Sequence, residues 1–176
     1  RISGPETIST VSELTGTEPE HHRLYVKDII HNEVFLDKCI VSFFKGPHSY
    51  TGEDMAEFSL HGGIASVKRF LSVLYEMGIA PAQRGEFTRR AYLNGKMDLI
   101  QAEAVLSIIE ARTVEGLDRA LQNSSGEFSA RVNDLRNSII NLKSYVDGSI
   151  DFPDDMEYDS DTFSSMLDMI RDKLET

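Results

Sequence analysis

Cysteine is nearly absent from this 176-residue chain, in which Cys39 is the only one. A single thiol excludes an internal disulfide and an all-cysteine metal site, and it fits a protein of the reducing cytoplasm. Long hydrophobic runs are missing too, since stretches such as residues 39–41 and 43–44 are only a few residues long. We therefore expect no transmembrane helix and no secretory signal. Because the chain begins with Arg1 instead of methionine, we expect a trimmed or partly ordered piece.

Positive charge is also scarce. The chain has 18 Lys and Arg residues against 29 Asp and Glu residues, and its net charge is −11. The net charge is −2 over residues 1–98 and −9 over residues 99–176. An acidic surface repels phosphate backbones, which argues against binding nucleic acid by bulk charge. A small ligand held in a local basic pocket is still compatible with this distribution.

The first hundred residues alternate between helix and strand signals. Glycine and proline positions and runs of Val, Ile and Phe define the elements. The predicted elements are a helix over residues 5–15, strands over 23–30, 34–44 and 55–61, and a helix over 62–78. The turn of the first hairpin is predicted at His31 and Asn32, and Gly78 should end the second helix. Strands and helices that mix in this way predict an α+β domain.

The remaining residues lack strand signals and predict helices. One narrow hydrophobic seam steps by three and four residues through Val132, Leu135, Ile139, Leu142 and Val146. Residues 123–126 either separate two helices or merely weaken one, and Pro153 should end the long helix. A further helix is predicted around residues 166–174. The apolar side chains of the seam must pack against other side chains, and residues 99–176 contain few other helices that could supply them. We therefore expect the packing partner in another part of the protein or in another subunit.

Two familiar catalytic signatures are incomplete. Residues 94–97 resemble the end of a P-loop, but Arg90 replaces the first glycine and Met97 replaces the Ser or Thr that would bind magnesium. Residues 61–63 resemble an esterase oxyanion loop, yet the sequence has no nucleophile elbow. The glycines of residues 61–63 either let backbone N–H groups at a helix start bind an anion or simply permit a tight turn.

The densest concentration of candidate residues lies between residues 46 and 99. Residues 46–54 form a long glycine-punctuated loop, and such loops are frequent at functional sites. Glu57 lies in the strand that follows. Residues 84–90 gather three arginines around a glutamate, and Lys96 follows in a loop. A carboxylate and a lysine brought together by such loops suit a ligand with N–H donors and an anionic end.

Several ordered runs in the chain are distinctive. Residues 50–57 read Tyr-Thr-Gly-Glu-Asp-Met-Ala-Glu, residues 61–63 read His-Gly-Gly, and residues 85–104 read Gly-Glu-Phe-Thr-Arg-Arg-Ala-Tyr-Leu-Asn-Gly-Lys-Met-Asp-Leu-Ile-Gln-Ala-Glu-Ala. Together with Arg-Ile-Ser-Gly-Pro at residues 1–5 and Asp-Phe-Pro-Asp at residues 151–154, they closely resemble the MnmE family, also called TrmE, of tRNA-modification GTPases. The resemblance covers nearly the whole chain.

The resemblance implies two domains. Residues 1–98 would form a tetrahydrofolate-binding and dimerisation domain, similar to that of the glycine-cleavage T-protein, without its first strand. Residues 99–176 would form the first part of an all-α helical domain, ahead of an inserted GTPase domain that lies outside this sequence. Catalytic residues for GTP hydrolysis are therefore not expected in this chain. Cys39 lies in a predicted strand and should not take the role of the family's C-terminal cysteine.

The resemblance also implies an activity for the full-length protein. The family is a potassium-dependent GTPase that works as a homodimer with the flavoprotein MnmG (GidA). Together they add a carboxymethylaminomethyl or aminomethyl group to C5 of the wobble uridine (U34) of certain tRNAs. A methylene-tetrahydrofolate would supply the one-carbon unit, and GTP, Mg²⁺ and K⁺ would bind the GTPase domain. The expected partners of this piece are a second copy, MnmG and, mainly through that complex, tRNA, with no membrane.

Three residues match folate contacts of the family by motif: Arg1, Glu57 and Lys96. A carboxylate such as Glu57 can accept two N–H bonds from the 2-amino-pyrimidinone edge of a pterin, bound as 5,10-methylene- or 5-formyl-tetrahydrofolate. Lys96 or Arg1 could hold carbonyl, formyl or glutamate oxygens of the ligand. Arg84 departs from the family, which usually has proline before Gly85.

Two other readings compete with folate binding. In the first, the loops serve the homodimer and the contact with MnmG, and the piece is an assembly module with weak or no folate affinity. In the second, residues 61–63 belong to an esterase-like hydrolase, which the missing nucleophile elbow makes remote. Titration with 5-formyl-tetrahydrofolate would discriminate between the first reading and folate binding.

The acidic residues 147–161 generate a prediction about metals. Starting from Asp155, Ser160 and Met166 stand where a calcium loop needs glycine and glutamate. We interpret the stretch as a solvated acidic connector and predict that it binds no metal. Calorimetric titration with Ca²⁺ should give no heat of binding, whereas micromolar affinity would contradict the interpretation.

Overall fold

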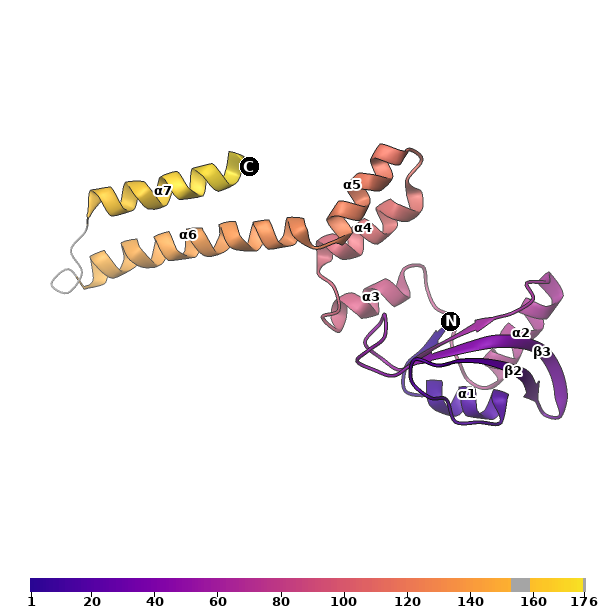
Figure 1. Cartoon of the computed structure of the whole chain (residues 1–176). Coiled ribbons are helices and arrows are strands. Elements are labelled where there is room, and N and C mark those ends of the chain that lie inside the picture. The colour runs from indigo at the N-terminus through magenta and orange to yellow at the C-terminus, as the bar shows by residue number, and fades with distance from the viewer. Residues whose placement is uncertain (153–158, 176) are drawn as a thin grey trace. The chain divides into compact units, whose positions relative to one another are not determined.

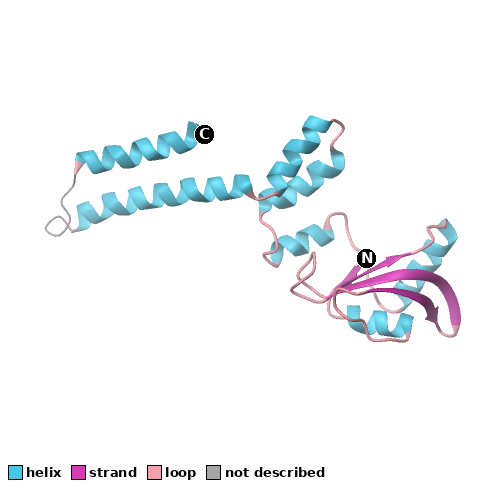
Figure 2. Ribbon diagram, viewed as in Figure 1, coloured by secondary structure: helices cyan, strands magenta, loops and turns pink. Residues whose placement is uncertain are grey.

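Two compact units make up the chain. The computed structural model describes residues 1–152 and 159–175, so part of the acidic connector, residues 153–158, lies outside the described residues. Unit 1 is Arg1–Ala102 and unit 2 is Glu103–Thr176. Unit 1 combines strands and helices, whereas the described part of unit 2 is helical (Figure 2). The prediction of an α+β domain followed by a helical segment is confirmed.

Unit 1 is built on one antiparallel sheet with the strand order β1-β4-β3-β2 (Figure 1). Its strands are β1 (Ile2–Ser3), β2 (Leu24–His31), β3 (Val34–Phe44) and β4 (Met55–Ser59). Three helices accompany them: α1 (Thr7–Thr15), α2 (Ile64–Glu76) and α3 (Glu86–Leu93). Gly16, in a left-handed conformation, caps α1, and Gly78 closes α2 in the same conformation, as predicted.

One face of this sheet carries the hydrophobic core. Side chains from α1 and α2 pack there against alternate residues of the strands, and the buried set includes Val11, Leu14, Val41, Phe43, Ala56, Phe70 and Leu74. Alternation along a strand sends the intervening residues to the other side. There Leu24, Val26 and Ile40 are 72%, 66% and 46% exposed. We call this second side the open face.

Two predicted boundaries are shifted by local backbone geometry. Asn32 and Glu33 occupy the hairpin turn with φ of 48° and 64°, and His31 pairs with Val34, so the turn begins one residue later than predicted. A two-residue hairpin turn of this kind needs positive φ at both central positions. Strand β4 ends at Ser59 instead of residue 61, because the His61 N–H donates to the Asp37 side chain and is not part of the hydrogen-bond ladder of the sheet.

Asp37 ties β3 to the start of α2. This side chain is buried on the sheet and accepts hydrogen bonds from the backbone N–H groups of His61 and Lys38 and from Ser66 Oγ. Its Oδ1 also lies 2.7 Å from His61 Nδ1. These donors, the His61 backbone first among them, lower the pKa of Asp37 to about 2. The His61 N–H binds Asp37, and Gly62 adopts φ 78° between β4 and α2.

The described residues from 99 onward form four helices in chain order. They are α4 (Leu99–Glu110), which spans the boundary between the units, α5 (Val114–Ser124), α6 (Glu127–Asp151) and α7 (Ser160–Glu175). Gly126, with φ 84°, stands between α5 and α6, so residues 123–126 do separate two helices. Helix α6 ends at Asp151, immediately before Phe152 and Pro153, as predicted.

Helix α7 packs beside α6 in unit 2. Lys173 Nζ reaches Asp134 at 2.7 Å and Ser138 at 2.9 Å, and the Tyr145 hydroxyl exchanges hydrogen bonds with the Asp159 backbone. The seam is nevertheless incompletely covered, since Val132 is 43% exposed and Ile139 is 49% exposed. None of the described helices is both long enough and apolar enough to cross a bilayer.

The environment of Asp37 predicts an acid-dependent contribution to stability. Its pKa is about 2 when folded and roughly 3.9 when unfolded. A lowered pKa stabilises the fold above the unfolded value, and the contribution is lost as pH falls toward 2. Asp37→Asn should therefore lower the melting temperature at pH 7, and its difference from wild type should shrink between about pH 4 and pH 2.

Thermal denaturation followed by circular dichroism across that pH range measures the effect. Asp28→Asn is the matched control, because Asp28 is exposed and pairs with Lys38 only at 3.7 Å. A difference between wild type and Asp37→Asn that stays constant from pH 7 to pH 2 would contradict the assignment.

Candidate functional site

The register of β1 on β4 brings Arg1 and Glu57 together. Ile2 lies opposite Ala56, so the preceding and following residues, Arg1 and Glu57, meet on the open face. Arg1 Nε and Nη2 both donate to Glu57 Oε1, at 2.7 and 2.5 Å. The two side chains are 45% and 36% exposed, so water screens the pair and its net stabilisation is small. Arg1 leaves Oε2 of Glu57 to other donors.

Two aromatic rings flank the Arg1 guanidinium. Its carbon lies 5.8 Å from the ring centre of Tyr50 and 5.5 Å from that of Phe87. A cation in this position is attracted by the ring faces. The Tyr50 hydroxyl lies 3.0 Å from Thr88 Oγ1 and so links the 46–54 loop to α3. The arrangement places a cation, a carboxylate and two flat apolar surfaces side by side.

Arg90 of α3 forms a second charged cluster with Glu53 and Glu86. It donates to Glu53 Oε2 and Glu86 Oε1, each at 3.0 Å, and to the Ser3 carbonyl at 3.3 Å. The hydrogen bond to Glu53, followed by that to Glu86, raises the pKa of Arg90. Ser3 Oγ also donates to Glu53 and lies 2.6 Å from the Thr51 hydroxyl. Strand β1, the loop and α3 are thereby joined through polar side chains.

The end of α3 determines where Lys96 lies. Gly95 adopts φ 68°, its N–H donates to Tyr92 O, and the Lys96 N–H donates to Ala91 O. This pair of hydrogen bonds is the Schellman pattern that ends a helix. Lys96 Nζ then donates to Pro47 O at 2.9 Å. Helix α3 therefore presents Lys96 against the start of the loop.

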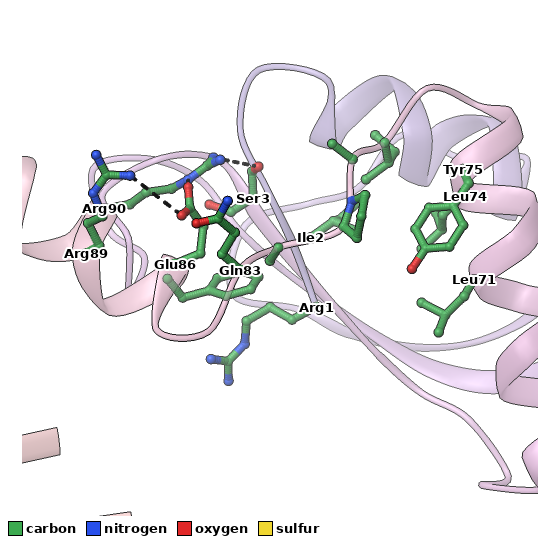
Figure 3. A pocket seen from close by; sticks show the side chains of 15 residues that line it. Arg1, Ile2, Ser3, Leu71, Leu74, Tyr75, Gln83, Glu86, Arg89 and Arg90 are labelled. Carbon is green, nitrogen blue, oxygen red and sulfur yellow. Dashed lines mark hydrogen bonds and ion pairs between the residues drawn. The ribbon is translucent and has the colours of Figure 1, made fainter. Parts of the chain in front are cut away.

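A cavity of about 470 Å³ lies beside Arg1 within unit 1. Figure 3 shows Glu86, Arg89 and Arg90 of α3 at one end and Leu71, Leu74 and Tyr75 of α2 at the other. One end is charged and the other is mostly apolar. Arg1 borders both this cavity and Glu57.

The structure brings two of the three predicted folate residues into direct contact. Arg1 and Glu57 form an ion pair, whereas Lys96 contacts the loop instead of either of them. Arg90 was one of the three arginines noted in residues 84–90, but neither it nor Tyr50 nor Phe87 was predicted to contact the ligand. The signal was available, because all three lie in the distinctive runs 50–57 and 85–104.

Other chemistry-bearing groups are less suited to a site. Burial raises the pKa of the Cys39 thiol to about 11, which leaves little of the reactive thiolate near neutral pH. Within residues 1–152 and 159–175, no three His, Cys, Asp or Glu side chains lie together in a way that could hold a metal ion.

The fold is an α+β unit followed by a helical domain, and family models identify both parts. The model described as "GTP-binding protein TrmE N-terminus" matches residues 1–96, and the one described as "MnmE helical domain" matches residues 99–176. The chain therefore belongs to the MnmE (TrmE) family.

Several curated relatives are named "tRNA modification GTPase MnmE". The protein of Thermosipho melanesiensis is 37% identical over 99% of this chain and 40% of its own length. That of Bordetella avium is 42% identical over 88% of this chain and 36% of its own length. That of Bartonella quintana is 38% identical over 99% of this chain and 38% of its own length. The chain thus spans roughly two fifths of the length of these relatives.

Gly52 is predicted to be essential for the geometry of the loop. Its φ is 79°, and a Cβ there would lie 3.2 Å from Asn94 Cβ and 3.3 Å from Lys96 Cγ. Gly52→Ala should therefore destabilise the chain by on the order of 1 kcal/mol through the left-handed backbone alone, and the crowding against Asn94 and Lys96 adds to that cost. Urea denaturation measures the change.

Gly16→Ala is the matched control. Gly16 also has positive φ, 68°, but no atom lies within 4 Å of its added Cβ. The left-handed backbone alone should therefore lower the free energy of unfolding of Gly16→Ala, by on the order of 1 kcal/mol. Equal losses of unfolding free energy in Gly52→Ala and Gly16→Ala would show that crowding of the added Cβ against Asn94 and Lys96 is unimportant.

Proposed function

We propose that this chain is the reduced-folate-binding and dimerising part of a tRNA-modifying GTPase, together with the first part of its helical domain. The full-length protein acts with MnmG to add a carboxymethylaminomethyl or aminomethyl group to C5 of the wobble uridine of certain tRNAs. A bound methylene-tetrahydrofolate supplies the one-carbon unit. Family membership and the names of the relatives support this proposal.

The pairing of Glu57 with Arg1 on the open face is the observation that carries the folate proposal. A pterin presents neighbouring N–H donors along one edge, and a carboxylate is their best acceptor. The Glu57 side chain is 36% exposed, and its Oε2 is not bound by Arg1. Tyr50 and Phe87 add flat surfaces next to the same place, which suits a planar heterocycle.

The remaining residues fit the other end of a folate. The guanidinium of Arg1 is close enough to Glu57 to bind a carbonyl or formyl oxygen of the same ligand. Lys96 Nζ donates to a neutral carbonyl oxygen, that of Pro47, so its charge is available to a glutamate carboxylate. Glu57, Arg1 and Lys96 thus offer the acceptor and the two cations that a reduced folate needs.

GTP hydrolysis belongs to another part of the protein in this proposal. The matched family models are an N-terminal and a helical domain. GTP, Mg²⁺ and K⁺ would bind the GTPase domain, and this chain alone should not hydrolyse GTP. The expected partners are a second copy of the chain, MnmG and tRNA, and the expected compartment is the cytoplasm.

The open face also favours a second candidate, an assembly module with little folate affinity. Leu24, Val26 and Ile40 are exposed apolar side chains on the face that carries Glu57. Apolar surface of this kind suits pairing with another copy. Both candidates predict a dimer, so only folate binding separates them.

Glu57→Gln is the sharpest test of the folate proposal. The glutamine oxygen can replace Oε1 toward Arg1, but the amide NH₂ would then face the ligand's N–H group. Loss of a desolvated, charged hydrogen bond typically costs about 2–4 kcal/mol. We predict that affinity for 5-formyl-tetrahydrofolate, measured by isothermal titration calorimetry, falls by at least about tenfold, or roughly 1.4 kcal/mol.

Glu18→Gln removes the same charge from an exposed position outside the site and should leave the affinity unchanged. Lys96→Ala should weaken binding in a manner that added salt reduces, because the lysine contact is exposed. Equal affinities of wild type and a folded Glu57→Gln dimer would refute the role of Glu57. A folded wild-type dimer without measurable folate binding would favour the assembly module.

A further inference from the structure

The three segments that surround Arg1 meet at the side chain of Arg90. From α3, Arg90 bonds to Glu53 in the loop and to the Ser3 carbonyl in β1, and it is fixed within its own helix by Glu86. Figure 3 shows Arg90 between Glu86 and Ser3. The Arg90 side chain is 37% exposed, and its carboxylate partners Glu53 and Glu86 are 30% and 19% exposed. The cluster is thus partly shielded from water.

Each of these segments contributes one part of the surroundings of Arg1. Arg1 immediately precedes β1 and lies two residues before Ser3. The loop carries Tyr50, three residues before Glu53, and α3 carries Phe87, one helical turn before Arg90. The distances from Arg1 to both rings therefore depend on how the loop and β1 are held against α3.

We infer that Arg90 is a positioning residue of the site, which holds the 46–54 loop and β1 on α3 so that Tyr50 and Phe87 close around Arg1. The expected effect of Arg90 on folate affinity rests on the proposed function. Arg90 does not touch Glu57 in the described contacts, so its effect passes through Arg1 and the two rings. Residues that lock the binding groups in place are what a site needs to keep its geometry within a fraction of an ångström.

The geometry requires arginine in this position. Arg90 uses Nε for Glu86 and Nη1 for both Glu53 and the Ser3 carbonyl. The planar guanidinium presents these donors in a rigid fork, whereas lysine offers a single nitrogen on a flexible stem. A lysine would keep the positive charge but would not bind both carboxylates and the carbonyl together. Arg90→Lys therefore tests position separately from charge.

The experiment compares the wild-type chain with Arg90→Lys, Glu53→Gln and the control Arg69→Lys. Arg69 is exposed on α2 and outside the cluster. Titration with 5-formyl-tetrahydrofolate gives affinity, and thermal denaturation gives stability. The NMR signal of the Arg1 side-chain Nε–H, recorded without ligand, reports the position of the guanidinium relative to Glu57 and the two rings.

Arg90→Lys should weaken folate binding by at least about tenfold and should shift the Arg1 Nε–H signal. The backbone signals of β2 and β3 should stay in place, which separates loss of positioning from general unfolding. Glu53→Gln should have the same two effects in weaker form, since it keeps an acceptor oxygen but removes the charge that strengthens the hydrogen bond from Arg90. Adding it to Arg90→Lys should cause little further loss. Arg69→Lys should match wild type.

Three results would overturn the inference. The first is wild-type folate affinity in Arg90→Lys. The second is an unmoved Arg1 signal in both Arg90→Lys and Glu53→Gln. The third is a change that spreads equally over β2 and β3. If wild type itself binds no folate, the proposed function fails, while the Arg1 signal still decides whether Arg90 positions Arg1.

Discussion

The pairing of Ile2 with Ala56 and of Ser3 with Met55 determines which side chains of β1 reach the core and which reach the site. Side chains alternate along a strand, so a slip of one residue would turn Arg1 toward the core and Ile2 toward solvent. The observed register buries Ile2 and places Arg1 and Ser3 on the other side. Arg1 then meets Glu57, and Ser3 meets Glu53 and Thr51. A ladder of two residue pairs thereby aligns both polar clusters of unit 1.

Local patterns in the sequence were sufficient for most of the secondary structure. Strand β3 has the predicted bounds, and Gly16 and Gly78 mark helix ends as expected. Gly126 precedes α6, which decides between the two alternatives for residues 123–126. These features depend on neighbours within a few residues, so the sequence records them directly. The hairpin turn was misplaced by one residue because His31, Asn32 and Glu33 are all polar, and only the pairing of His31 with Val34 distinguishes the positions.

The geometry of the candidate site could not be predicted from local patterns. Glu57 and Arg1 were named by resemblance, but 56 residues separate them and only the sheet register brings them into contact. The same is true of Arg90 and Glu53, which are 37 residues apart and meet because α3 returns to the loop. The clusters of arginine and glutamate in the sequence indicate that ion pairs form, without showing which residues are partners.

Strand β2 is an outer strand of the sheet, and its register with β3 shifts between Ile29 and Ile30. An irregularity of this kind twists an edge and breaks the even row of N–H and C=O groups that a further strand would need. The ion pair of Asp28 with Lys38 adds charge next to the irregular step. The β2 edge is therefore a poor template for strand addition, which protects it from edge-to-edge aggregation.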